Sequence, residues 1–500
     1  MNYKMIRYII GQLLLVEGAL MLLPLAVSLI YGEFQTSWAF VIPILALVLF
    51  GGSLTAFKPK DKALRAKDGF VIVGLSWIIL SLFGCLPYII SGLIPSFVDA
   101  FFETVSGFTT TGSSVISAEG FATLWSPENI ACGTRGVFFW RSFTNWIGGM
   151  GVLVFVLAVM PQQDMKSSRL VHVMRAEMPG PKVDKIVATV KKTSAIMYGI
   201  YAVMTATLCI LLIFGGMDLY ESLCTSFATA GTGGFSVWSD GMMTYGGVTH
   251  PEYCTWTIAI FMLLFSINFN LYFLLITGKI ASAIFSEELW WFIGIVATAT
   301  ALTTWNVYSF YHNFSDSLRH AFFQVSSIIS TSGFATTDFN LWPNLSKTVL
   351  LIIMFIGACA GSTGGGIKVS RIVIAAKSAF AEIVHMVRPR QVQKVRFEKK
   401  AVDSETIKGI YAYAIVYAFI FFASFLIIAI CDGQTIETTV SSVSACLNNI
   451  GPALGEAGPM SNYAFYSAVS KIVLSFDMLL GRLEIFPIIM LFSPSVWRGK

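Results

Sequence analysis

Four short segments of this sequence end in a threonine or asparagine that is followed two residues later by a glycine. The segments are DAFFETVSGFTTTG (99–112), DLYESLCTSFATAG (218–231), HAFFQVSSIISTSG (320–333) and TTVSSVSACLNNIG (438–451). Glycine tolerates left-handed backbone conformations, so such a turn can direct its carbonyl oxygens toward a common axis. Rings of carbonyl oxygens replace the hydration shell of a monovalent cation. The predicted cation site therefore consists of Thr110, Thr111, Gly112, Thr229, Ala230, Gly231, Thr331, Ser332, Gly333, Asn449, Ile450 and Gly451.

The same three-residue pattern also occurs as an ordinary helix C-cap, and a single copy would indicate nothing more. Four copies at equivalent places favour a cation filter and a fourfold internal duplication. The apolar stretch before each turn is expected to form a short helix whose partly negative C-terminal end faces the ion. Asp99 and Asp218 occupy the places where N-cap carboxylates of these helices belong.

A second group of residues is the glycine-rich segment GACAGSTGGG, which interrupts a long apolar run. Its glycines must break a helix, since each costs about 1 kcal/mol relative to alanine. A phosphate-binding loop is excluded, because Ile367 follows where such a loop needs Lys-Ser/Thr. A kink that serves only helix packing is one reading. We favour a movable gate below the filter, formed by Gly357, Gly361, Ser362, Thr363, Gly364, Gly365, Gly366 and Arg482.

Arg482 lies in the last apolar segment, where a guanidinium is costly and is usually paired or functional. Facing the pore, it would repel cations and could donate hydrogen bonds to carbonyls of the glycine-rich segment. The alternative is a buried ion pair with Asp477 or Glu484. For three further charged residues within apolar segments we favour a structural role, either in buried pairs or in ties to the short helices. These residues are Glu103, Arg141 and Lys471.

The elements that would carry these residues are membrane-spanning helices. Of 500 residues, 55% are hydrophobic and only 12% are charged, which is too apolar for a soluble domain. A span needs roughly 20 mostly apolar residues, and the four short segments are better suited to enter the membrane and return. Ten long segments qualify as spans: 7–31, 39–57, 70–92, 135–160, 194–215, 255–278, 289–311, 347–385 (interrupted), 408–431 and 463–492.

Lysine and arginine concentrate in three connections, at residues 58–67, 166–192 and 368–400. Basic connections remain in the cytoplasm, so both termini are expected inside and the short segments enter from the outer face. The predicted fold is an all-α polytopic membrane protein with four tandem repeats of membrane helix, pore helix with loop, and membrane helix, in pseudo-fourfold arrangement. The predicted units are an N-terminal two-helix unit (1–68), repeat 1 (69–193), repeat 2 (194–286), repeat 3 with the intramembrane gating loop (287–400) and repeat 4 (401–500).

Other function classes find less support in the sequence. The cysteines form no CxxC pair and the five histidines are scattered, so neither a cysteine or histidine metal site nor an intramembrane enzyme is expected. Aromatic-interleaved basic runs are absent, which argues against nucleic acid as a partner. A secondary transporter of an organic solute would show inverted repeats, whereas these repeats have the same sense. The residues leave open whether cation flux is passive or coupled to protons or sodium.

Several strings of the sequence resemble one known family. The four turns, RSFTNWIGGMGV (141–152), GSTGGGIKVSR (361–371) and MLLGRLEIF (478–486) are similar to the Trk/Ktr/HKT superfamily of potassium transporters. The two additional N-terminal spans make the chain most similar to the bacterial TrkH/TrkG branch. The resemblance covers essentially the whole chain, and the last two strings are highly specific.

The resemblance implies potassium uptake across the bacterial cell inner membrane by a multi-pass homodimer with one pore in each protomer. Potassium would be the transported ion, and no organic cofactor is expected on this chain. A cytosolic RCK-type nucleotide-binding subunit of the TrkA class would open the gate. The four turns carry over as the filter, and Gly357–Gly366 with Arg482 as the gate. Glycine in all four loops goes with potassium selectivity in this superfamily, and Asn449 departs from threonine but offers a side-chain carbonyl.

Overall fold

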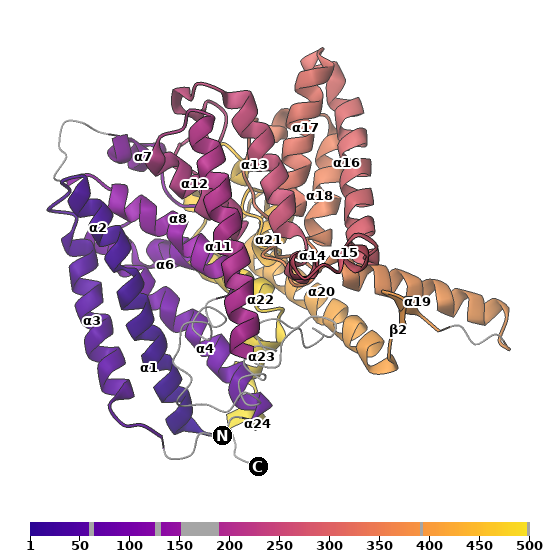
Figure 1. Ribbon diagram of the computed structural model, residues 1–500, viewed down its shortest axis with the longest axis horizontal. Coiled ribbons are helices and arrows are strands. Elements are labelled where there is room, and N and C mark those ends of the chain that lie inside the picture. Colours follow the sequence, from indigo (N-terminus) through magenta and orange to yellow (C-terminus); the bar gives the residue numbers. More distant parts are fainter. Residues whose placement is uncertain (60–64, 126–131, 152–189, 391–393, 498–500) are drawn as a thin grey trace.

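The protein is an all-α bundle, and the predicted polytopic helical fold is confirmed (Figure 1). The computed structural model describes residues 1–59, 65–125, 132–151, 190–390 and 394–497. Within these ranges the strands are β1 (Arg396–Phe397) and β2 (Lys400–Ala401), which pair as one antiparallel hairpin. The N-terminus and the last described helix, which ends at Trp497, lie near each other at one end of the bundle (Figure 1).

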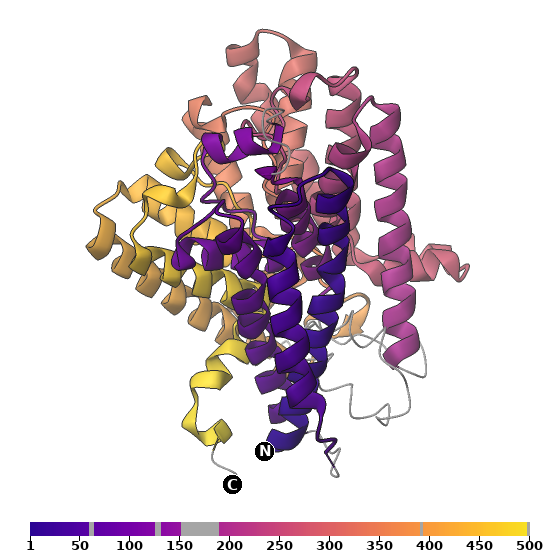
Figure 2. The ribbon, with the colours of Figure 1, turned by 90° about the vertical axis from the view of Figure 1, so that its left-hand side faces the viewer.

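The N-terminal unit consists of α1 (Tyr3–Leu20), α2 (Leu22–Ile30) and α3 (Trp38–Thr55). Figure 2 shows α1 and α3 side by side in the foreground of the view, which is the left-hand side of the molecule in Figure 1. Their backbones approach closely at Gly11, where an added methyl carbon would lie 2.8 Å from Leu54 Cβ. The outward face of α3 is apolar, including Leu45, Leu49 and Phe50, as a lipid-facing surface requires.

The rest of the chain repeats one order of elements four times: a long helix, a short helix, a turn and a returning helix. The first set is α4 (Ala66–Gly84), α5 (Leu86–Ile90), α6 (Phe97–Phe108), α7 (Ala118–Trp125) and α8 (Arg135–Gly149). The second set is α11 (Val190–Phe214), α12 (Leu219–Gly231), α13 (Pro251–Ser266), α14 (Phe269–Ile276) and α15 (Ile280–Ile284).

The third set is α16 (Glu287–Tyr311), α17 (Phe314–Ile329), α18 (Asn344–Ile356) and α19 (Val369–Val387). The fourth set is α20 (Ser404–Asp432), α21 (Ile436–Leu447), α22 (Ala468–Arg482), α23 (Phe486–Phe492) and α24 (Pro494–Trp497). Among the described residues, one 3-10 turn follows α12 (Tyr245–Gly247), one follows α17 (Phe339–Leu341) and two follow α21 (Gly455–Ala457 and Tyr463–Phe465). The exact limits of the four repeats stay predictions.

Fewer helices are long, straight and apolar enough to span a membrane than the ten predicted segments. Among the described residues five qualify: Tyr3–Ile30, Trp38–Thr55, Lys67–Ile90, Ala195–Phe214 and Ser404–Asp432. Three returning segments are broken: α13 and α14 meet at 90°, residues 357–368 separate α18 from α19, and residues 483–485 separate α22 from α23. The predicted segment 135–160 begins with α8 and then leaves the described residues. The breaks free backbone groups in the interior, where other loops can bond them.

The short helices start at side-chain caps on one face and end inside the bundle. Ser96, Asp218, Asn313 and Thr435 are their N-caps. The prediction for Asp218 is confirmed, and Glu221 completes a capping box with it. The prediction for Asp99 is wrong, because Ser96 accepts the hydrogen bond from the Asp99 amide. Asp99 lies in the first turn and instead forms an ion pair with Lys471 at 2.6 Å.

Candidate functional site: four turns and a glycine-rich loop

Each short helix ends in a residue whose backbone is left-handed although it is not glycine. These residues are Thr110 (φ 57°), Thr232 (φ 56°), Thr331 (φ 61°) and Asn449 (φ 57°). After each of them, the next amide donates to the carbonyl five residues earlier, at 2.8 or 2.9 Å, so the four turns have the same hydrogen-bond pattern. This is the bonding of a Schellman helix end. All four left-handed residues are fully buried.

The second turn lies three residues later than the sequence alignment predicts, and that alignment is wrong for this repeat. Thr229, Ala230 and Gly231 form the last turn of α12, where the Thr229 hydroxyl donates to Thr225 O at 2.8 Å. The equivalent of the other three turns is the run from Thr232 to Gly234. A shared string, TGGF at 232–235 and TSGF at 331–334, would have revealed this register. The predicted alignment instead matched the earlier glycine.

The four turns close into a ring. A methyl carbon built on the third residue of each turn would lie against the carbonyl oxygen of the middle residue of the next turn, well inside van der Waals contact. Only glycine therefore fits at these four places, and each has a positive φ as well. The pairs, with the distance from added carbon to oxygen, are Gly112 and Gly233 (2.2 Å), Gly234 and Ser332 (1.9 Å), Gly333 and Ile450 (1.9 Å), and Gly451 and Thr111 (2.6 Å).

Buried polar side chains support this ring of turns from behind. Asn449 Nδ2 donates to Thr111 Oγ1 at 3.0 Å and to Met478 O at 2.9 Å, which connects the fourth turn to the first. Arg141 Nε forms an ion pair with Glu103 at 2.7 Å, with exposed fractions of 3% and 0%. The same Glu103 accepts from Val115 N at 2.8 Å, in the chain that leaves the first turn. The predicted structural role of Arg141 and Glu103, a buried pair tied to a pore helix, agrees with these contacts.

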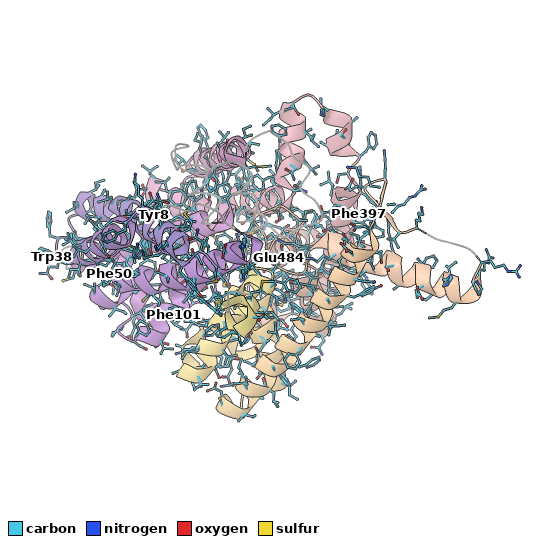
Figure 3. All side chains as sticks on the ribbon, turned by 90° about the horizontal axis from the view of Figure 1, so that it is seen from below. Tyr8, Trp38, Phe50, Phe101, Phe397 and Glu484 are labelled. Carbon is cyan, nitrogen blue, oxygen red and sulfur yellow. The ribbon has the colours of Figure 1, made fainter. Side chains whose placement is uncertain are left out.

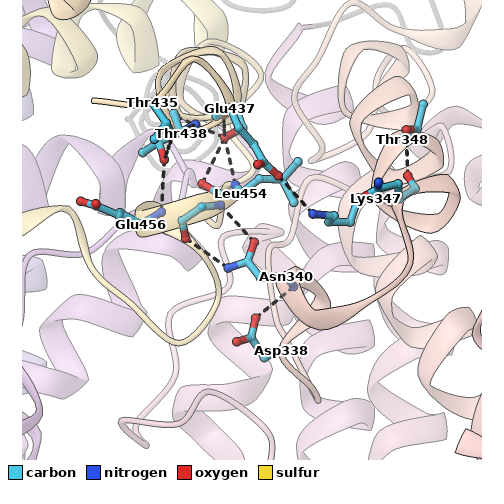
Figure 4. Close-up of polar contacts among 12 residues, drawn as sticks. Asp338, Asn340, Lys347, Thr348, Thr435, Glu437, Thr438, Leu454 and Glu456 are labelled. Atoms are coloured by element: carbon cyan, nitrogen blue, oxygen red, sulfur yellow. Dashed lines mark hydrogen bonds and ion pairs between the residues drawn. The ribbon is translucent and has the colours of Figure 1, made fainter. Parts of the chain in front are cut away.

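On the outer side of the ring a polar network joins the segments that leave the third and fourth turns (Figure 4). The Asn340 side chain donates to Gly455 O at 3.1 Å and accepts from Gly455 N at 3.0 Å. The Glu456 amide donates to Thr438 Oγ1 at 3.2 Å. These bonds join the segment after the fourth turn to the start of α21 and to the segment after the third turn. The chain that leaves these turns is therefore fixed as well as the short helices that precede them.

The glycine-rich loop, residues 357–368, lies directly against the third and fourth turns. The Gly365 amide donates to Thr331 Oγ1 at 2.6 Å, and a methyl carbon on Gly365 would lie 2.5 Å from Asn448 O. The loop also bonds to the break between α13 and α14, where Phe269 N donates to Gly361 O at 3.0 Å. The Thr363 hydroxyl donates to Phe265 O at 3.0 Å. The free backbone groups of the broken helix thus receive their partners from this loop.

Arg482 reaches this loop from the end of α22. Its Nη1 donates to Thr363 O at 2.6 Å, and its Nη2 donates to Gly149 O at 2.6 Å and to Gly148 O. The two carboxylates considered as ion-pair partners lie elsewhere: Asp477 accepts from Ser424 at 2.7 Å, and Glu484 pairs with Arg371. The guanidinium therefore connects the glycine-rich loop with the end of α8. The contact with Thr363 O agrees with the prediction that Arg482 donates to a carbonyl of the loop.

Comparison with known proteins places this architecture in a family. The sequence profile of TrkH, described as a cation transport protein, matches residues 36–498. The chain belongs to the TrkH family. It is 34% identical, over the full length of both chains, to the Trk system potassium uptake protein TrkH of Escherichia coli K12 and equally to that of Salmonella typhimurium. It is 31% identical to the Escherichia coli protein TrkG, covering 99% of that chain. The crystal structure of the potassium transporter TrkH from Vibrio parahaemolyticus matches all of both chains with a TM-score of 0.86 at 30% identity.

In this TrkH-family chain, the strings that carried the resemblance are the ones that pack around the ring. In the run 141–152, a methyl carbon on Gly148 would lie 1.8 Å from Phe108 O, so α8 touches the backbone of the first short helix. In the run 478–486, one on Gly481 would lie 2.0 Å from Leu447 O, at the end of α21. Close backbone contact, which only glycine permits, is the physical reason for glycine at both places.

Sequence reasoning missed several residues at this site. Besides the turn from Thr232 to Gly234, it overlooked Lys368, whose ammonium donates to Gly364 O within the loop. It also overlooked Arg371, which pairs with Glu484 and lies over the Tyr413 ring at 4.4 Å. Glu484 lies near the middle of the molecule when it is viewed from below (Figure 3). The basic string IKVSR (367–371) had indicated a cytoplasmic connection, and its position next to the glycines was the available signal.

Proposed function

We propose that this chain carries potassium across the bacterial inner membrane through the ring of turns. The filter would consist of Thr110–Gly112, Thr232–Gly234, Thr331–Gly333 and Asn449–Gly451. The observation that carries the proposal is the closure of the ring, in which each glycine abuts a carbonyl of the next turn. Four converging turns with carbonyl oxygens at one level are what a dehydrated monovalent cation needs. The potassium transport named for its relatives supports the same cargo.

The glycine-rich loop and Arg482 would act as the gate of this filter. The loop lies against two of the turns and carries no regular secondary structure, so it is the part of the interior that can move with least loss of packing. Arg482 holds it through Thr363 O and places a positive charge beside it, which opposes the passage of cations. Displacing the loop would break these bonds and remove both obstacles.

The setting of this transport follows the relatives and the distribution of charge. We place the chain in the inner membrane with both termini in the cytoplasm, in agreement with the basic connections and with the hydrogen bond from Tyr3 to Trp497 O, which joins the two ends of the described chain. A homodimer with one pore in each protomer, opened by a nucleotide-binding cytosolic subunit, is the assembly that the family resemblance supports.

Rubidium-86 uptake by liposomes that contain the purified chain tests the proposal. We expect a saturable flux that needs no ATP and that potassium inhibits more strongly than sodium. Empty liposomes serve as the control. A flux no greater than theirs, with the regulatory subunit present or absent, would overturn the proposal. Recording currents with and without an imposed proton gradient then separates a passive pore from coupled transport.

The contact with a regulatory subunit has its own test. Arg388 and Arg390 lie at the exposed end of α19, at the start of the basic connection to the hairpin. We expect the double charge reversal Arg388→Glu and Arg390→Glu to abolish co-purification with the subunit and to leave rubidium flux of the isolated chain unchanged. Undiminished co-purification would remove this connection from the docking surface.

A further inference from the structure

A buried carboxylate outside the ring holds the glycine-rich loop at its middle. Glu288, in the first turn of α16, has only 5% of its surface exposed. Its Oε1 accepts a hydrogen bond from the Ala360 amide at 2.8 Å. A carboxylate in this position is costly unless donors satisfy it. The bond therefore fixes the loop at Ala360, three residues before Thr363, where Arg482 holds it.

The start of α16, and Glu288 with it, is held by the hairpin of β1 and β2. Glu398, in the turn of the hairpin, accepts from Ser286 Oγ at 2.7 Å and from the Glu288 amide at 3.1 Å. In return the Glu398 amide donates to Glu287 Oε2 at 3.1 Å. Three hydrogen bonds therefore connect the hairpin turn with the helix start that carries Glu288.

The hairpin is also connected with α19, the helix that continues from the loop. Lys377 on α19 forms an ion pair with Glu287 and donates to Arg396 O in β1 at 3.0 Å. The hairpin thus bridges the start of α16 and α19, and Arg388 and Arg390 lie between α19 and the hairpin in the sequence. In Figure 1, β2 lies below α19, on the side of the termini.

Space for movement is present next to the hairpin. A cavity of about 780 Å³ separates it from α14 and α15, and Ala360, Glu288, Phe397 and Glu398 line this cavity. Phe397 lies on the side toward which α19 extends, away from the central Glu484 (Figure 3). The hairpin is thus not packed tightly on this side, and its displacement would pull directly on the bonds to the start of α16.

We propose that Glu288 is a positioning residue of the gate and that the hairpin is the latch through which the cytoplasmic side controls it. When the hairpin moves away from the start of α16, Glu288 shifts with the helix start. The Ala360 amide then loses its acceptor, and the loop is released from the turns. This inference rests on the proposed role of the glycine-rich loop as a gate. It adds an anchor at Ala360 to the one that Arg482 provides at Thr363, and a route by which a cytoplasmic partner acts.

The test compares Glu288→Ala with Glu288→Gln in rubidium-86 uptake by liposomes without the regulatory subunit. We expect Glu288→Ala to raise basal uptake about ten-fold, since a hydrogen bond to a charged acceptor is lost. Glu288→Gln keeps an oxygen for the Ala360 amide and should raise uptake less than about three-fold. The control is Glu405→Ala, because Glu405 lies in the first turn of α20 and is exposed. Equal uptake by Glu288→Ala and wild type, or equal effects of the alanine and glutamine variants, would overturn the role of Glu288.

The latch is tested separately at the hairpin turn, where a substitution does not disturb the interior. We expect Glu398→Ala to raise basal uptake several-fold and to reduce the further increase on adding the regulatory subunit. If Glu398→Ala changes neither the basal uptake nor the further increase with the subunit, the latch is overturned. This result is decisive even if Glu288→Ala does not fold. Arg482→Ala is measured in parallel. If it raises uptake and the Glu288 and Glu398 variants do not, only this inference fails; if none of them does, the proposed gate fails as well.

Discussion

The ring of turns and the glycine-rich loop touch each other, but different interactions hold them. In the ring, backbone packs on backbone: each glycine lies against a carbonyl of the next turn, and no side chain could be added without a clash. In the loop, side chains hold the backbone by hydrogen bonds: Arg482, Glu288 and Thr331 come from other elements, and Lys368 comes from the end of the loop itself. Interlocked backbone segments permit only one arrangement, whereas a side chain that forms a hydrogen bond can change to another partner.

In the proposed pore, this difference would separate selectivity from gating. Selectivity depends on the positions of oxygens to within a fraction of an ångström, and interlocked turns preserve those positions. Gating requires a change between two arrangements of similar free energy. A loop held by several side-chain bonds, each contributing on the order of 1–3 kcal/mol, can move between such arrangements without unfolding the bundle. Substitutions should therefore separate stability and selectivity from opening.

The largest expected effect is on stability, at the buried pair behind the ring. Glu103→Ala leaves the Arg141 guanidinium buried at 3% exposure without its carboxylate, which typically costs about 3–5 kcal/mol. We expect a clear decrease in the melting temperature of the detergent-solubilised protein, with no increase in basal rubidium uptake. Raised uptake at an unchanged melting temperature would mean that the pair belongs to the gate instead.

The next effect is on opening, at Arg482. Arg482→Ala removes hydrogen bonds to Thr363 O and Gly149 O together with a positive charge. Loss of one charged hydrogen bond, on the order of 1.5–3 kcal/mol, predicts basal uptake at least about ten-fold above wild type. Arg482→Lys keeps the positive charge but loses the planar set of donors. Its basal uptake should therefore lie between those of wild type and Arg482→Ala. Uptake at or below the wild-type level in Arg482→Ala would contradict the proposed gate.

A smaller effect is expected on selectivity, at the glycines of the ring. Gly112→Ser and Gly234→Ser both push a side chain against the carbonyl of the next turn. We expect each to reduce the preference for potassium over sodium about ten-fold, equivalent to about 1.4 kcal/mol. Competition of either ion with rubidium uptake measures the preference. Gly199→Ser is the matched control, because an added carbon there meets no atom within 4 Å. A normal preference in Gly234→Ser would speak against Thr232–Gly234 as the second filter turn.

The smallest effect is expected at the outer network. Lys347 and Glu437 form an ion pair at 3.3 Å, with exposed fractions of 20% and 51%. Exposed pairs contribute less than about 1 kcal/mol. Lys347→Ala should therefore change neither the melting temperature by more than a few degrees nor the basal uptake. A large effect of this substitution would show that the outer contacts, and not the buried ones, keep the turns in place.

Much of the architecture could be predicted from local sequence. Hydrophobic runs indicated the membrane helices, and the recurring glycines indicated the turns, because only glycine accepts that backbone. The register of the second turn was missed because α12 continues for one more helical turn before the left-handed residue, whereas the alignment was made on the earlier glycine, Gly231. The break before α23 was missed for a similar reason: Glu484 and Ile485 both have positive φ, which their residue types do not favour.

Taken alone, the sequence determined which segments are apolar, which places require glycine and which connections are basic, because these properties depend on one residue and its near neighbours. The tertiary structure alone decided which groups meet. Thr363 lies 119 residues from Arg482, and Ala360 lies 72 residues from Glu288. Such contacts form only when the four repeats close around one axis. The ring and the glycine-rich loop therefore depend on the packing of all four repeats together.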